Sequence, residues 1–157
     1  MQNNENWNAY DFEFSHIVRE IKTPVTIYSS RNSTEGENIN IDAIWDTGAT
    51  NSVISPLIVQ KLGLSSIDKS IMSGISYKNR VSDVVVATIV LPNGKIINDK
   101  RFSVNEIPGT EVLIGMDIIT MGDFAISIVK GKTIFSFVTP PLNNKISFME
   151  LLNEPVV

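Results

Sequence analysis

The strongest constraint on the fold is a succession of short β-rich runs separated by turn signals. Two stretches, 56–62 and 116–121, instead favour short helices, and each is followed by a glycine that can end a helix. Many short strands with two short helices predict a mostly β domain, either closed or sandwich-like. The β-rich runs lie at about 12–19, 22–29, 39–46, 69–77, 82–91, 95–105, 111–114, 124–129 and 132–138, with Val53-Ile54 as a further short piece.

The length of 157 residues, with 43% hydrophobic and 19% charged side chains, is that of one soluble domain with a core. We expect a polar leader over 1–15, the folded domain over 16–139, and a tail over 140–157 that follows a Pro-Pro pair. No secretory signal is present, and no apolar run approaches the ~18 residues of a membrane span. A cytoplasmic location without a membrane partner is therefore expected.

Composition also excludes several kinds of site. The net charge of −4 and the pI near 5.0 speak against a nucleic-acid partner or an anionic membrane surface. The absence of cysteine excludes disulfides, thiolate nucleophiles and cysteine zinc sites. His16 is the single histidine and is expected to be structural, so neither a histidine metal site nor a serine–histidine catalytic pair is expected. We expect no metal and no cofactor.

One acidic residue occupies an unusual place in the chain. In the stretch IWDTGATNSVIS, residues 44–55, Asp46 stands where an apolar strand meets a glycine turn. Burying an ionised carboxylate without a partner is costly. Gly48 allows backbone N–H groups to approach this carboxylate, which favours its ionised form. Such a group can act as a general base, a nucleophile, a metal ligand or part of a phosphate site.

Two motifs together resemble the retropepsin-like aspartic protease family. The first is Asp-Thr-Gly-Ala-Thr at 46–50, and the second is Val-Leu-Ile-Gly-Met-Asp at 112–117, with Gly115 placed 69 residues (115 − 46) after Asp46. The resemblance covers about residues 22–138. Viral members carry an Asp–Arg ion pair where this chain has Thr50 and Met116, so the cellular and bacterial branches are the better match. The resemblance implies a closed, retropepsin-like barrel with one or two short helices.

The resemblance also implies a catalytic site shared between two chains. The family builds its site from two Asp-Thr-Gly loops, and none of the other seven aspartates in this chain begins a second one. The partner of Asp46 should therefore be Asp46 of a second copy in a two-fold homodimer. The two carboxyl groups would share one proton and activate a water that hydrolyses a peptide bond, without a covalent intermediate. Asp46, Thr47 and Gly48 form the expected catalytic loop, with the Thr47 hydroxyl bonding across the dimer.

Pepsin-like loops often carry a hydroxyl side chain at the position of Ala49, which bonds the catalytic carboxylate. Because Ala49 lacks this hydroxyl, we expect activity at milder acidity than that of pepsin.

The expected substrate is an extended polypeptide bound by backbone hydrogen bonds and side-chain pockets. A hairpin over 71–83, containing Gly74 and Ile75, is expected to close over it as a flap, although a glycine-rich tip is replaced by Ser76-Tyr77-Lys78-Asn79. The alternatives without a role in substrate binding are ordinary core packing for the pocket-wall residues and a surface hairpin for residues 71–83. The residues that match pocket walls of the family are Ile44, Ala49, Val53, Val112 and Leu113.

Other readings stay open. The same fold could be a catalytically silent peptide-binding or dimerisation module. Residues 46–52 also resemble the phosphate loop of actin-like ATPases, but the chain is too short for the two lobes of such enzymes. A metal site on Asp42 and Asp46 is disfavoured, because four residues at ~3.3 Å each separate the side chains by more than ~12 Å.

Overall fold

The computed structural model describes residues 7–30, 34–74, 77–144 and 147–153. As predicted, the chain is mostly β with few short helices. Its elements are β1 (Asn8–Glu13), β2 (Ile21–Tyr28), β3 (Asn38–Trp45), β4 (Val53–Ile54), α1 (Pro56–Lys61), β5 (Asp68–Gly74), β6 (Tyr77–Val90), β7 (Ile96–Val104), β8 (Val112–Ile114), α2 (Met116–Ile119), β9 (Asp123–Val129), β10 (Lys132–Thr139) and α3 (Phe148–Asn153).

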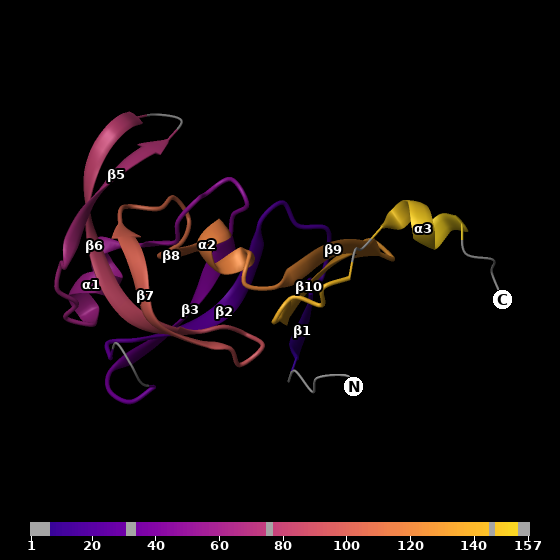
Figure 1. Ribbon diagram of the computed structural model, residues 1–157, viewed down its shortest axis with the longest axis horizontal. Coiled ribbons are helices and arrows are strands. Elements are labelled where there is room, and N and C mark those ends of the chain that lie inside the picture. Colours follow the sequence, from indigo (N-terminus) through magenta and orange to yellow (C-terminus); the bar gives the residue numbers. More distant parts are fainter. Residues whose placement is uncertain (1–6, 31–33, 75–76, 145–146, 154–157) are drawn as a thin grey trace.

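Seven strands form the larger sheet, in the order β2-β3-β8-β4-β7-β6-β5 (Figure 1). Strand β6 also pairs with β2, through Thr88–Val90 and Thr26–Tyr28, so the order of pairing returns to the first strand. Most neighbours are antiparallel, but β3 runs parallel to β8 and β4 runs parallel to β7. Because β3 and β8 are parallel, the residues that follow Trp45 and Ile114 leave the sheet side by side.

The smaller sheet has the order β1-β10-β9 and lies at the other end of the molecule from the β5–β6 hairpin (Figure 1). Its strand β1 covers 8–13, within the expected leader and earlier than the strand expected over 12–19. The reason is the alternation of Tyr10 and Phe12 along β1, which places both rings on one face of the sheet, with Phe14 stacked after them. The turn signals after residue 13 then connect β1 to β2.

Trp45, the last residue of β3, joins the two sheets. Its ring packs against Phe135 and Phe137 of β10, with centroid distances of 4.9 and 4.8 Å. The indole N–H donates a buried hydrogen bond to the Thr23 hydroxyl, at 2.8 Å. Burying each of these rings contributes about 1.5–3 kcal/mol, so the end of β3 is held firmly from both sides.

The helices are short. The Ser55 hydroxyl caps α1 by accepting the Ile58 N–H at 3.3 Å, and Pro56 occupies the first helical position. Gly63 follows the helix, as predicted, at a φ of +60°. Helix α3, which was not predicted, projects from the end of the molecule (Figure 1). None of the helices in the described ranges has the length and apolar character that a membrane crossing requires.

Candidate active site

Asp46 begins a loop directly after β3, and the end of β8 holds its backbone. The Asp46 N–H donates to the Ile114 carbonyl at 2.9 Å, and the Ala49 N–H donates back to the Asp46 carbonyl at 3.2 Å. The carboxylate accepts the Gly48 N–H at 2.8 Å. Asp46 is half-buried, whereas Thr47 and Gly48 are exposed in the single chain. The predicted catalytic loop is therefore a fixed turn with its tip at the surface.

Gly48 and Gly115 are both needed where the backbone passes close to other atoms. A Cβ on Gly48 would lie 3.1 Å from the Asp46 carboxylate oxygen that the Gly48 N–H reaches. A Cβ on Gly115 would lie 2.7 Å from the carbonyl carbon and oxygen of Asn51 and 2.9 Å from the Ala49 oxygen. Gly115 has an ordinary φ of −95°, so the requirement there is space and not backbone freedom.

The segment after Gly115 is bonded along the Asp46 loop. The Met116 N–H donates to the Ala49 carbonyl at 2.8 Å, and the Asp117 N–H donates to the Thr50 carbonyl at 3.2 Å. The Asp117 carboxylate in turn accepts from Ser52 and forms an ion pair with Lys100. Asp117 lies inside the second sequence motif, but sequence reasoning assigned no role to it, to Ser52 or to Lys100.

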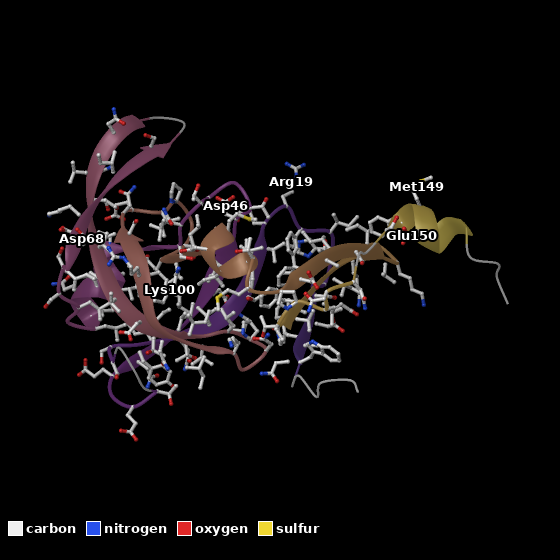
Figure 2. All side chains as sticks on the ribbon, in the orientation of Figure 1. Arg19, Asp46, Asp68, Lys100, Met149 and Glu150 are labelled. Carbon is white, nitrogen blue, oxygen red and sulfur yellow. The ribbon has the colours of Figure 1, made fainter. Side chains whose placement is uncertain are left out.

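A cavity of about 360 Å³ opens beside Asp46 and Thr47. Its apolar wall comes from Ile44 and Trp45 of β3, from Ile119 of α2 and from the smaller sheet, and Arg19 and Glu20 stand at its edge. Figure 2 shows Asp46 on its loop above α2, with Arg19 on the neighbouring loop between β1 and β2. The smaller sheet contributes Phe124, Ile126 and Phe135. A larger cavity, about 670 Å³ between α1 and β6, contacts none of the residues of the Asp46 loop.

Three of the predicted wall residues lie in one row across adjacent strands. Leu113 of β8 pairs with Ile44 of β3 on one side and with Val53 of β4 on the other. Ile44 and Leu113 are half-buried, whereas Val53 is 6% exposed. Val112 points to the opposite face of β8 and is fully buried in the core, so its side chain packs the fold and does not line an open surface. Ala49 is half-buried next to the Asp46–Gly48 turn.

The expected flap region is an antiparallel hairpin of β5 and β6, which rises from the body of the molecule (Figure 1). Gly74 ends β5, and Ile75 lies outside the described residues. Of the four residues expected to form its tip, Tyr77, Lys78 and Asn79 belong to β6, and Ser76 lies outside the described residues.

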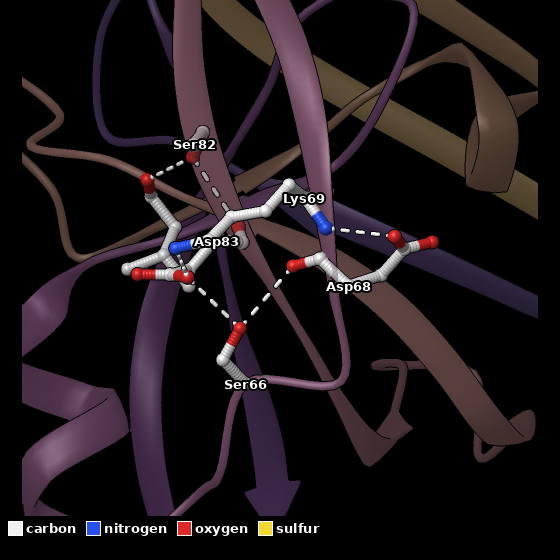
Figure 3. A network of polar contacts seen from close by, with 6 residues as sticks. Ser66, Asp68, Lys69, Ser82 and Asp83 are labelled. Carbon is white, nitrogen blue, oxygen red and sulfur yellow. Dashed lines mark hydrogen bonds and ion pairs between the residues drawn. The ribbon is translucent and has the colours of Figure 1, made fainter.

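Charged side chains link the base of this hairpin to its surroundings (Figure 3). Lys69 forms an ion pair with Asp83 across the hairpin. Arg101 of β7 bonds Asp68 at 2.6 Å. The Ser66 hydroxyl donates to Asp83 at 2.9 Å. The Arg101 guanidinium and the Lys69 backbone N–H hold the pKa of Asp68 below its ordinary 3.8. The hydrogen bonds from Lys69 and then Ser66 lower the pKa of Asp83 in the same way.

Metal-binding chemistry finds little support in the described ranges. They contain no group of three or more His, Asp or Glu side chains close enough to hold a metal ion. The site combines the Asp46 carboxylate and backbone N–H groups with an adjoining cavity that is mostly apolar and that Arg19 and Glu20 also line.

Comparison with known proteins agrees with this geometry. The family model described as "gag-polyprotein putative aspartyl protease" matches residues 33–121. A retropepsin-like aspartic protease from Rickettsia conorii is similar in structure, with a TM-score of 0.52 and 17% identity over 85% of this chain and 95% of that one. A comparison with curated proteins gave no match.

Two further solved structures align with lower TM-scores. The EIAV protease complexed with the inhibitor HBY-793 gives 0.45, with 27% identity over 64% of this chain and 86% of that one. The retroviral protease-like domain of Ddi1 from Leishmania major gives 0.47, with 18% identity over 71% of this chain and 84% of that one.

Proposed function

The chain belongs to the gag-polyprotein putative aspartyl protease family, with a retropepsin-like fold, and from this premise we propose that it is an aspartic endopeptidase. The observation that carries the proposal is the Asp46 loop. Its carboxylate is half-buried and oriented by the Gly48 N–H, while Thr47 and Gly48 remain exposed beside an apolar cavity. A catalytic carboxylate needs this combination of fixed position and access.

The mechanism requires Asp46 from each of two chains. Two carboxyl groups about 3 Å apart share one proton, because both cannot ionise easily. The ionised group takes a proton from a water held between them, and the water oxygen bonds to the scissile carbonyl carbon. The protonated group donates its proton to the carbonyl oxygen. The resulting gem-diol collapses as a proton reaches the amide nitrogen and the C–N bond breaks.

The smaller sheet supports the homodimer that this mechanism needs. Strand β9 is an edge strand, and Phe124, Ile126 and Ile128 alternate along one of its faces with exposures of 37%, 50% and 56%. Unpaired edges with apolar side chains favour pairing with another strand. Because Phe124 and Ile126 line the same cavity as Asp46, a second copy that covers this face also reaches the catalytic loop. Antiparallel pairing of β9 with its own copy satisfies a two-fold axis.

The substrate is proposed to be an extended polypeptide. The half-buried side chains of Ile44 and Leu113 provide apolar contact beside Asp46, and the β5–β6 hairpin provides the flap. The pairing of β6 with β2 supports the further proposal that the larger sheet closes into a barrel, which would keep these walls rigid.

Cleavage of a mixed peptide library by the wild type and by Asp46→Asn tests the function. We expect cleavage by the wild type and none by the variant. Addition of a threefold excess of Asp46→Asn chains should lower the activity of each wild-type chain to about a quarter, because random pairing leaves about a quarter of them with a wild-type partner. Peptide binding without cleavage by either protein would favour the silent binding module, and activity insensitive to added variant would exclude the shared site.

A further inference from the structure

We propose that Asp117 is a positioning residue which, with Ser52 and Lys100, fixes the Asp46 loop for catalysis. The inference rests on the proposed function, because it concerns the geometry of the same loop. The three side chains come from distant parts of the sequence: Ser52 precedes β4, Lys100 lies in β7, and Asp117 lies in the first turn of α2. Figure 2 shows Lys100 within the body of the molecule and not at its edge.

The Asp117 carboxylate is surrounded by hydrogen-bond donors. The Ser52 N–H donates to both carboxylate oxygens at 3.0 Å each, and the Ser52 hydroxyl donates to Oδ1 at 2.7 Å. The Lys100 ammonium group forms an ion pair with Oδ2. Ser52 and Lys100 present only donors to the Asp117 side chain, so this position requires a group that accepts through both of its terminal atoms. A carboxylate can do this and an amide cannot.

The ion pair is more enclosed than other ion pairs of the molecule. The side chains of Lys100 and Asp117 are 12% and 21% exposed, and Ser52 is fully buried. Four other ion pairs have side chains that are all at least 35% exposed. An ion pair in such a place is strongly coupled to its surroundings, because loss of one partner leaves the other charge poorly solvated. The low exposure of the Lys100–Asp117 pair therefore favours one fixed arrangement of the two side chains.

These contacts continue into the catalytic loop. The Ser52 hydroxyl gives its one hydrogen to Asp117, and its oxygen accepts the Gly115 N–H at 3.1 Å. The Asp117 N–H bonds the Thr50 carbonyl. The loop that starts at Asp46, pinned by the Ile114 carbonyl, is thus tied again at its far end by Asp117. A displacement of about 1 Å at a reacting group can cost about 100-fold in rate, so this second tie is a determinant of catalysis.

The test uses four variants of the full chain. Asp117→Asn keeps the shape but places an NH₂ group against a donor, and Ser52→Ala removes only the hydroxyl. The double variant Lys100→Met with Asp117→Asn removes both charges and so avoids an unpaired lysine. Glu13→Gln, which breaks an exposed ion pair with Lys132 away from the hairpin and from the Asp46 loop, is the matched control.

Asp117→Asn and the double variant should lower kcat about 10- to 100-fold with little change in KM, and Ser52→Ala should act in the same direction. The double variant should recover thermal stability relative to Asp117→Asn without recovering kcat. Glu13→Gln should leave kcat at the wild-type value. A kcat that returns together with stability would show a merely structural role and overturn the proposal.

Amide hydrogen exchange provides a readout that does not depend on activity. In Asp117→Asn, exchange at Gly48, Ser52 and Gly115 should accelerate about tenfold or more, while the core strands β2 and β6 keep their wild-type protection. Faster exchange at these amides in a protein that cleaves nothing would sink the proposed function but support the tie. Unchanged exchange in the loop, whether or not the protein cleaves peptides, would overturn the tie itself.

Discussion

Gly115 illustrates how a single residue without a side chain helps to hold the Asp46 loop in place. The strand that ends at Ile114 and the loop that starts at Asp46 approach so closely that three backbone atoms of Ala49 and Asn51 lie within 2.9 Å of the place a Cβ would occupy. The closeness is what permits the hydrogen bonds from Met116 and Asp117 to the loop carbonyls. The close approach at Gly115 and the hydrogen bonds to the loop therefore depend on the same feature, the absence of a side chain at this position.

Gly115→Ala should cost about 3 kcal/mol of unfolding free energy and abolish cleavage, because backbone atoms cannot move aside as a flexible side chain can. Urea unfolding and peptide cleavage measure the two effects. Gly63→Ala is the control: its φ of +60° costs about 1 kcal/mol, but nothing lies within 4 Å of the new Cβ. Equal losses at the two positions, or normal cleavage by Gly115→Ala, would contradict the steric explanation.

At the scale of single residues, the sequence predicts those features of the site that depend on residues close together in the chain. Asp46, Thr47 and Gly48 form one turn, so their spacing already indicates a fixed carboxylate, and the family they suggested is confirmed. The tie of Asp117 to Ser52 spans 65 residues. No local pattern marks such a contact, and an aspartate one residue after Met116 looks like any residue in the first turn of a helix.

The β5–β6 hairpin depends on charges at its base. The ion pair Lys69–Asp83 joins β5 to β6 (Figure 3), and Arg101–Asp68 joins β7 to β5. Both carboxylates have pKa values below 3.8 for that reason. All four side chains are well exposed, so each ion pair alone is weak. Because both ion pairs lie at the base of the same hairpin, we expect them to control how readily the hairpin opens locally.

Hairpin protection should therefore fall in acid. A carboxyl group whose pKa is lower in the folded than in the unfolded state stabilises the folded state above the unfolded value, and that contribution is lost as the pH falls through the folded value. Exchange protection of β5 and the first half of β6 should hold from neutral pH to about pH 4 and decrease below it. The double variant Asp68→Asn with Asp83→Asn should show low exchange protection of the hairpin at every pH. The control variant Asp11→Asn, on the smaller sheet, should keep the protection of the wild type. A pH step retained by the double variant would contradict the assignment.

Whole elements were predicted best where two signals coincide. The run Leu91 to Lys95, between the strands expected at 82–91 and 95–105, forms a turn with Gly94 at a φ of +78°. Both predicted helices start at the expected residues. β1 was misplaced because Asn-rich sequence before Tyr10 suggested a leader, while the strand is defined by its pairing with β10, more than a hundred residues away. Propensity cannot reveal a partner at that separation.

In the whole molecule, the smaller sheet has an apolar edge, where Phe124, Ile126 and Ile128 of β9 are exposed. On the side of the smaller sheet that faces the larger one, Phe135 and Phe137 pack on Trp45. Outward, the same face of the sheet continues onto β9, where Phe124 and Ile126 are exposed. The aromatic cluster thus connects the end of β3 to the surface that we propose for the second copy.

Ile126→Lys should break the proposed dimer without unfolding the chain, because Ile126 is half exposed in the single chain and a lysine there meets solvent. In the dimer the same ammonium would face an apolar surface, so the dimer dissociation constant should rise at least about 100-fold. Sedimentation over a range of concentrations measures this constant, and specific activity should fall in proportion to the dimer fraction. Ser127→Lys, on the opposite face of β9, should associate as the wild type does. If Ile126→Lys stays dimeric and active, the two chains meet elsewhere; if the wild type cleaves peptides as a monomer, one Asp46 suffices, and the covered edge of β9 has no part in catalysis.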